Sequence, residues 1–205
     1  MNLTQLKNLI EAALLAYGQP LNMDQIRGLF DEADRPEPGA LREALETLSR
    51  ECADRPMELL EVASGWRLQV RSEFAPALSR LWQERPGRYS RALLETIALI
   101  AYRQPITRGE IENVRGVQVN PNIVRTLTER GWIRVVGHRE VPGHPELLGT
   151  TREFLDYFGL KSLDELPSLA ALKDMDDVGI QLEFADTVQA APADLPAAND
   201  AEAVV

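Results

Sequence analysis

The chain has 205 residues, 44% hydrophobic and 26% charged, which is ordinary for a globular protein and excludes a fibrous or low-complexity chain. One cysteine, Cys52, excludes an internal disulfide framework, and one cysteine with two histidines cannot form a Cys/His zinc site. No apolar stretch near the start reaches the roughly 18 residues that a membrane helix needs, and no signal-peptide cleavage site follows it. We therefore expect a cytoplasmic protein with no membrane contact.

The net charge of −10 is unevenly distributed along the chain. Residues 173–205 hold eight acidic residues and one lysine, with no apolar periodicity after about Phe184. Such a segment cannot bury enough apolar surface to offset the entropy of ordering it, so we expect residues 171–205 to form a disordered acidic tail. Residues 102–139 instead hold seven arginines and three acidic residues, so the acidity of the whole chain does not exclude an anionic partner.

An internal repeat organises the rest of the chain. Residues 13–21 read Ala-Leu-Leu-Ala-Tyr-Gly-Gln-Pro-Leu, and residues 98–106, offset by 85, read Ala-Leu-Ile-Ala-Tyr-Arg-Gln-Pro-Ile. Only the pair Gly18 and Arg103 differs in character. The repeat predicts two copies of one small domain, which we place at residues 1–85 and 86–170.

In the first copy, apolar residues at helical spacing predict a first helix that ends before Pro20, and the capping-box pattern Asn22-x-x-Gln25 opens a second. In a later hairpin, Trp66, Leu68 and Val70 alternate with polar residues, which predicts one buried face. The predicted elements are helices over residues 3–17, from Asn22 and over 41–48, a hairpin over 57–62 and 66–71, a linker helix over 73–83 and a turn at 85–87.

The second copy repeats this order. Thr107-x-x-Glu110 is its capping box, and Asn120-Pro121 opens a third helix that ends at Gly131. The predicted elements are helices over residues 93–102, from Thr107 and from Asn120, a hairpin over 133–139 and 146–150, and short helices over 152–158 and 162–169. Three short helices followed by a hairpin form a winged helix. We therefore predict a mainly α fold with small β-hairpins, built as tandem winged helix-turn-helix domains with a disordered acidic C-terminal tail.

No sequence pattern indicates catalysis. The chain has no phosphate-binding loop, dinucleotide fingerprint or nucleophile elbow. His138 and His144 flank the second hairpin turn beside two glutamates, but a metal site needs three or four ligands in fixed geometry, so we interpret them as exposed hairpin residues. We expect no enzyme, no metal and no cofactor, and we expect Cys52 to pack as a small hydrophobic residue.

The first predicted helix carries apolar residues on a second face, including Leu9, Ala12, Leu15 and Ala16. A domain of about 70 residues has little material to cover both faces, so the pattern indicates a partner chain, by default a second copy. The candidate dimer-interface residues are Leu6, Leu9 and Leu15. Tyr17 and Tyr102, at equivalent positions of the two copies, are either interface anchors or core rings whose hydroxyls bond to the backbone, and their repetition in both copies favours the core interpretation.

The arginines of the second copy are candidates for partner contact. Arg103 replaces Gly18 and is therefore not required by the shared fold, and Arg125 and Arg130 lie on the helix that enters the major groove in a DNA-reading winged helix. Phosphate contact, an arginine-rich protein interface and a solvated face remain open. Interspersed acidic residues weaken the DNA interpretation. The candidates are Arg103, Arg115, Arg125, Arg130 and Arg134.

Residues 90–108, Ser-Arg-Ala-Leu-Leu-Glu-Thr-Ile-Ala-Leu-Ile-Ala-Tyr-Arg-Gln-Pro-Ile-Thr-Arg, closely resemble the hallmark segment of the segregation and condensation protein B family. Further matching motifs are Arg115-Gly116-Val117, residues 125–131, Val141-Pro142-Gly143 and residues 149–167. The resemblance covers roughly residues 3–169. It implies a tandem winged-helix, non-enzymatic subunit of the bacterial condensin-like complex, which dimerises chiefly through its N-terminal domain.

The resemblance also implies a partner and a role. Members of this family embrace the kleisin subunit, segregation and condensation protein A, which bridges the heads of the structural-maintenance-of-chromosomes ATPase during chromosome condensation and partition. We expect a nucleoid-associated protein whose contact with DNA is indirect or weak, and whose second copy uses its arginines to hold an acidic, amphipathic kleisin segment. The alternative is a transcriptional regulator that binds DNA through the second winged helix.

Overall fold

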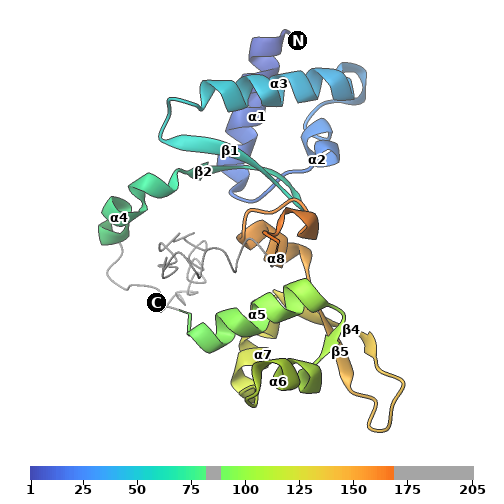
Figure 1. The fold of residues 1–205 in the computed structure, drawn as a ribbon. Coiled ribbons are helices and arrows are strands. Elements are labelled where there is room, and N and C mark those ends of the chain that lie inside the picture. The colour runs from blue at the N-terminus through green and yellow to red at the C-terminus, as the bar shows by residue number, and fades with distance from the viewer. Residues whose placement is uncertain (82–88, 169–205) are drawn as a thin grey trace, which may run out of the picture.

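The computed structural model describes residues 1–81 and 89–168, which form two units, each with several helices and a small antiparallel sheet (Figure 1). The prediction of a mainly helical chain with small antiparallel sheets is confirmed. The predicted turn at residues 85–87 and the predicted acidic tail at 171–205 lie outside the described residues.

The first unit packs its hairpin against two crossing helices (Figure 1). Its core is formed by Ile10, Leu41, Leu48 and their neighbours, with Trp66 and Leu68 packed against it from the hairpin. A single bridge between Leu21 and Trp66 fastens the loop after the first helix to the hairpin. Its elements are α1 (Leu3–Tyr17), α2 (Met23–Arg27), α3 (Pro38–Glu51), β1 (Met57–Val62) and β2 (Gly65–Val70), with a 3-10 turn at Glu32–Asp34.

The second unit repeats the order with one added strand. The strand order is β3-β5-β4, so β4 lies at one edge of the sheet. Ile100, Ile111, Leu127 and Ile133 are fully or almost fully buried in its core. Its elements are α5 (Arg91–Arg103), β3 (Ile106–Thr107), α6 (Arg108–Arg115), α7 (Pro121–Glu129), β4 (Ile133–His138), β5 (Glu146–Thr150) and α8 (Arg152–Tyr157).

The predicted starts of α2, α6 and α7 are confirmed. Both capping boxes close: the Asn22 side chain accepts from the Gln25 N–H, and the Thr107 hydroxyl accepts from the Glu110 N–H, with each partner side chain bonding back. Asn120 caps α7 with Pro121 in its first turn, and Gly131 follows α7 at a φ of 69°, which favours glycine.

Two predicted helices are wrong in extent. The linker helix over residues 73–83 is instead α4 (Ala75–Leu78) between 3-10 turns at Ser72–Phe74 and Ser79–Leu81. A helix that began at residue 73 would form its first hydrogen bond from the N–H of residue 76 to the carbonyl of residue 72, and Pro76 has no N–H, so the helix begins later. The helix over 162–169 is a single 3-10 turn at Leu163–Glu165, because Pro167 holds the residue before it extended.

The prediction for the first hairpin is only partly confirmed. Trp66 and Leu68 pack on the core, but Val70 is 53% exposed because it lies at the end of β2. The opposite face of β2 is not simply solvated either. Arg67 is half-buried and interacts electrostatically with Asp156 of the second unit, so tertiary contacts cover part of the face that alternation assigns to solvent.

Candidate protein-interaction surfaces

The outer side of α1 is exposed and carries no charge. It is formed by Leu9, which is 40% exposed, Leu15, which is 55% exposed, and their exposed neighbours Gln5, Asn8, Ala12 and Ala16; we call these six residues the α1 face. A free helix surface normally carries charged side chains opposite its buried stripe. The α1 face is therefore suited to contact with another protein chain.

The two charged residues of α1 are both turned away from the α1 face. Lys7 is buried and its ammonium pairs with Glu51 at the end of α3. Glu11 accepts a hydrogen bond of 2.7 Å from Arg55. These ion pairs hold α1 against α3 and the turn that follows α3, and leave only neutral side chains on the outer side of α1.

Leu6 does not belong to this surface. It is 4% exposed and packs in the core of the first unit, so its assignment to a dimer interface is corrected, because its side chain lies on the stripe that faces α3. Tyr17 departs from expectation in the other direction, since it is 52% exposed rather than part of the core. Tyr102 is half-buried, and its hydroxyl donates to the Pro167 carbonyl at 2.5 Å, as expected of a hydroxyl that finds a backbone partner.

Three of the five candidate arginines have partners within the domain. Arg115 pairs with Glu95 at 3.0 Å and its side chain is only 10% exposed, which corrects its assignment to a partner-contact surface: it ties α6 to α5. Arg125 pairs along α7 with Glu129 at 3.2 Å. Arg130 donates to the Tyr89 hydroxyl at 2.8 Å and lies over the Tyr89 ring.

The ring under Arg130 belongs to an aromatic cluster beside α8. Tyr89 and Tyr157 each pack against Trp132, with centroid distances of 5.3 and 4.5 Å, and their hydroxyls lie 3.1 Å apart. Burial, followed by the hydrogen bond to Tyr89, raises the pKa of the Tyr157 hydroxyl, which therefore stays protonated at neutral pH. Arg130 is thus part of a structural cluster rather than a free contact residue.

Arg103 and Arg134 are placed differently. Both are exposed, and neither has an ion pair with another described residue. Arg103 ends α5, and Arg134 lies on β4 opposite Gly149 of β5. Of the five candidate arginines, these two are therefore the most available for an ion pair with another protein.

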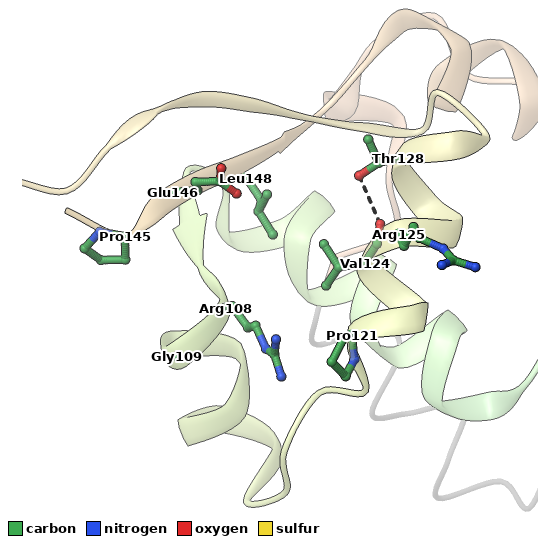
Figure 2. A pocket seen from close by; sticks show the side chains of 9 residues that line it. All are labelled: Arg108, Gly109, Pro121, Val124, Arg125, Thr128, Pro145, Glu146 and Leu148. Atoms are coloured by element: carbon green, nitrogen blue, oxygen red, sulfur yellow. Dashed lines mark hydrogen bonds between the residues drawn. The ribbon is translucent and has the colours of Figure 1, made fainter. Parts of the chain in front are cut away.

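A cleft of about 490 Å³ lies between α6, α7 and β5 (Figure 2). Its walls are mainly apolar: Pro121 and Val124 come from α7, and Pro145 and Leu148 come from β5 and the residue before it. The Arg125 side chain points away from this opening in Figure 2. The remaining lining residues are Arg108, Gly109, Arg125, Thr128 and Glu146.

Two of the polar side chains that line the cleft, Arg108 and Thr128, are already engaged. Arg108 donates to the Val119 carbonyl at 2.6 Å and to Glu112 at 3.0 Å, and Thr128 donates to the Val124 carbonyl at 3.0 Å. Binding in the cleft would therefore depend mainly on apolar contact. Sequence analysis missed the cleft because its walls come from three separate segments, each of which shows only the pattern of its own helix or strand.

The two units are joined by α8 and the segment that follows it, which lie against the tip of the first hairpin (Figure 1). The Ser64 N–H donates to the Asp156 carboxylate at 2.9 Å, and the Ala63 N–H donates to the Leu160 carbonyl at 2.9 Å. Lys161 pairs with Glu61 at 2.7 Å. We call these contacts the interdomain joint.

The remaining titratable candidates form no ligand site. No three His, Cys, Asp or Glu side chains among the described residues could hold a metal ion, and both histidines are exposed on the β4–β5 hairpin or its turn. Cys52 is 1% exposed, as expected of a small core residue, and burial raises the pKa of its thiol. Within residues 1–81 and 89–168, no helix is long and apolar enough to cross a membrane.

Comparison with known proteins supplies the context for these surfaces. A protein 52% identical over 175 residues, from Coxiella burnetii, is a segregation and condensation protein B homolog; the match covers 85% of this chain and 84% of that one. Segregation and condensation protein B of Syntrophotalea carbinolica is 43% identical over 169 residues, covering 82% and 84%.

Solved structures give related matches. The crystal structure of ScpB from Mycobacterium tuberculosis is 32% identical, covers 78% of this chain and 98% of that one, and has a TM-score of 0.36. A dimer of an ScpB N-terminal domain in complex with a ScpA peptide is 29% identical, covers 39% and 98%, and has a TM-score of 0.34. The model of the family described as "Segregation and condensation complex subunit ScpB" matches residues 8–169. The chain therefore belongs to the ScpB family.

Proposed function

We propose that this chain is a tandem winged-helix, non-enzymatic subunit of a condensin-like complex, acting in chromosome condensation and partition in the cytoplasm at the nucleoid. It binds the kleisin subunit as a homodimer and reaches the structural-maintenance-of-chromosomes ATPase through that kleisin. Membership of the ScpB family supports the assignment. The kleisin we name is ScpA, the protein whose peptide accompanies the ScpB dimer described above.

The observation that carries the proposal is the uncharged α1 face. A second copy covers it by packing Leu9 and Leu15 against their equivalents across a two-fold axis. Burying these side chains supplies apolar contact that a single unit of this size lacks. The first unit therefore serves as the dimerisation domain.

The second unit supplies the kleisin contact. Its cleft offers apolar walls at Val124 and Leu148, and Arg103 and Arg134 offer exposed positive charges for an acidic segment. Apolar contacts give most of the binding energy in such an interface, and charged groups fix orientation and rate of association. The acidic, amphipathic kleisin segment fits these two requirements.

The alternative of a DNA-binding regulator is not favoured by the charges around α7. In a DNA-reading winged helix this helix carries free cationic side chains to the phosphates, but here Arg125 is paired with Glu129. Arg139 of the hairpin is paired with Glu110. An arginine that is already paired with a glutamate neutralises a DNA phosphate poorly and so displaces few counterions from the duplex. We therefore expect weak, strongly salt-dependent DNA binding without sequence preference.

Calorimetric titration of the full-length protein with its kleisin tests the proposal. Thr128→Arg fills the mouth of the cleft, and Asn122→Arg adds the same side chain on α7 outside the cleft lining. We expect Thr128→Arg to weaken kleisin binding by about tenfold or more and Asn122→Arg to leave it unchanged. Wild-type affinity in Thr128→Arg would remove the cleft from the kleisin interface.

A second pair of measurements separates the function classes. Arg103→Glu combined with Arg134→Glu should weaken kleisin binding without changing the melting temperature, because both side chains are exposed. Titration with duplex DNA across a salt series should show no sequence-selective binding. Selective DNA binding with no kleisin binding would establish the regulator instead.

A further inference from the structure

The interdomain joint is mainly polar, whereas each unit has an apolar core of its own. The buried clusters of the two units, within the described part of the chain, share no residue. The closest apolar approach at the joint is at Gly159, where a Cβ would lie 3.2 Å from a methyl carbon of Leu60 and where the φ of 70° favours glycine. Units that meet through a small polar interface move relative to one another unless other contacts prevent it. The joint is therefore able to open while both cores stay intact.

Two backbone donors at the tip of the first hairpin are satisfied by the second unit. The Ala63 N–H donates to the Leu160 carbonyl and the Ser64 N–H donates to the Asp156 carboxylate, each at 2.9 Å. Ala63 and Ser64 lie in the turn between β1 and β2. When the joint opens, these two N–H groups must bond to water instead. Their hydrogen exchange with solvent therefore reports the opening.

Opposite charges face each other across the joint. Lys161 pairs with Glu61 at 2.7 Å, and their side chains are 52% and 41% exposed. The hydrogen bond to Glu61, and then its charge, raise the pKa of the Lys161 ammonium. Arg67 and Asp156 attract each other beside this pair. Since Lys161 and Glu61 are half exposed, dissolved ions screen their attraction, so the joint weakens as the salt concentration rises.

We propose that the interdomain joint is a salt-sensitive latch: its ion pairs hold the two units in one arrangement, and its two backbone hydrogen bonds open together when these pairs are broken. The open state keeps both units folded and exposes the hairpin tip. The α1 face and the cleft belong to different units, so the latch also sets how these two surfaces are placed relative to each other. A partner that contacts both units thereby favours one of the two states. The proposal does not depend on the kleisin assignment, because every group of the latch belongs to this chain.

Amide hydrogen exchange of the full-length protein, measured residue by residue by nuclear magnetic resonance, tests the salt dependence. Raising the NaCl concentration from about 0.05 M to about 1 M should speed the exchange of the Ala63 and Ser64 amides by about twofold to fivefold. The Leu21 amide, which donates to the Trp66 carbonyl within the first unit at 2.9 Å, is the reference and should not change. Unchanged exchange at Ala63 and Ser64 would overturn the proposal. Equal acceleration at Leu21 would also overturn it, because the first unit would then be unfolding.

A charge swap tests the ion pair directly. Lys161→Glu or Glu61→Lys alone replaces attraction by repulsion and should speed the exchange of the two tip amides by about fivefold or more, while the combined change should restore most of their protection. Glu43→Lys makes the same change of charge at an exposed residue of α3 and should have no effect. Failure of the combined change to restore protection would show that the Lys161–Glu61 pair does not hold the latch.

Asp156→Ala tests whether the joint opens as one unit. The change removes the acceptor of the Ser64 N–H and leaves the Leu160 carbonyl, the acceptor of the Ala63 N–H, in place. If one opening event exposes both amides, the exchange of Ala63 should speed by about the same factor as that of Ser64. Acceleration confined to Ser64 would overturn a latch that opens cooperatively.

Discussion

The Ser64 N–H donates a hydrogen bond of 2.9 Å to the Asp156 carboxylate, although the two residues belong to different units and lie 92 positions apart in the chain. Burial lowers the pKa of the neighbouring Arg67 guanidinium, and the charge of Asp156 opposes that effect. One carboxylate thus serves both a backbone donor and a half-buried cation of the first hairpin. It is a central contact of the interdomain joint.

Asp156→Ala removes this acceptor and leaves Arg67 with less countercharge. We expect a loss of about 1–2 kcal/mol in the free energy of unfolding, since the bond is charge-assisted but only partly buried. Small-angle X-ray scattering should show a wider distribution of distances between the units. Asp54→Ala, at an exposed aspartate, is the control, and an unchanged scattering curve for Asp156→Ala would show that other contacts fix the units.

The α1 face predicts the oligomeric state. Leu9→Glu or Leu15→Glu should convert the dimer to a folded monomer, because each change places a charge in an apolar contact. Leu29→Glu, at a leucine 47% exposed outside α1, should leave the dimer intact. Light scattering measures the mass and circular dichroism checks folding. A folded dimer in both α1 variants would exclude this face from the interface.

Arg115 and Arg103 should behave in opposite ways. Glu95 pairs both with the exposed Arg91 and with the largely buried Arg115. Arg115→Ala removes the buried partner, and we expect a loss of about 1–3 kcal/mol in the free energy of unfolding. Arg103→Ala should change stability by no more than about 0.5 kcal/mol, since Arg103 is exposed and forms no ion pair within the described residues. Urea unfolding of the two variants measures the difference. Equal losses would show that the Arg115–Glu95 pair contributes nothing specific.

The ionised Glu110 carboxylate should make the second unit less stable at low pH. The hydrogen bond from the Thr107 N–H, and then the ion pair with Arg139, hold the pKa of the Glu110 carboxyl below its ordinary value of 4.5. A carboxyl whose pKa is lower in the folded state adds stability above its unfolded pKa. That stability is lost as the pH falls through the folded pKa.

Glu110→Gln keeps a side-chain acceptor for the capping box but removes the charge. We expect this variant to be less stable than the wild type at neutral pH and to lose less stability when the pH falls below about 4.5. Melting temperatures across this pH range measure the effect. Glu140→Gln, at an exposed hairpin position, is the control; parallel pH curves for wild type and Glu110→Gln would contradict the prediction.

The local elements of the fold follow from the sequence because they rest on neighbouring residues. The capping boxes at Asn22 and Thr107 bond within four positions, so their patterns alone indicate where helices begin. Apolar spacing likewise predicted α1 and exposed Leu9 and Leu15 on its outer side. The family resemblance lies in the same stretches of chain, and the family is confirmed.

Only the tertiary structure decided which side chains remain available to a partner. Arg103 and Arg115 look alike in the sequence, but Arg115 forms an ion pair with Glu95, twenty positions earlier in the chain. Arg103 forms no ion pair with another described residue. The cleft beside Val124 and the joint at Asp156 also combine residues from distant segments. Helical and strand periodicities report the face of one element, whereas partners and cavities depend on which elements meet, and that is fixed only when the chain packs.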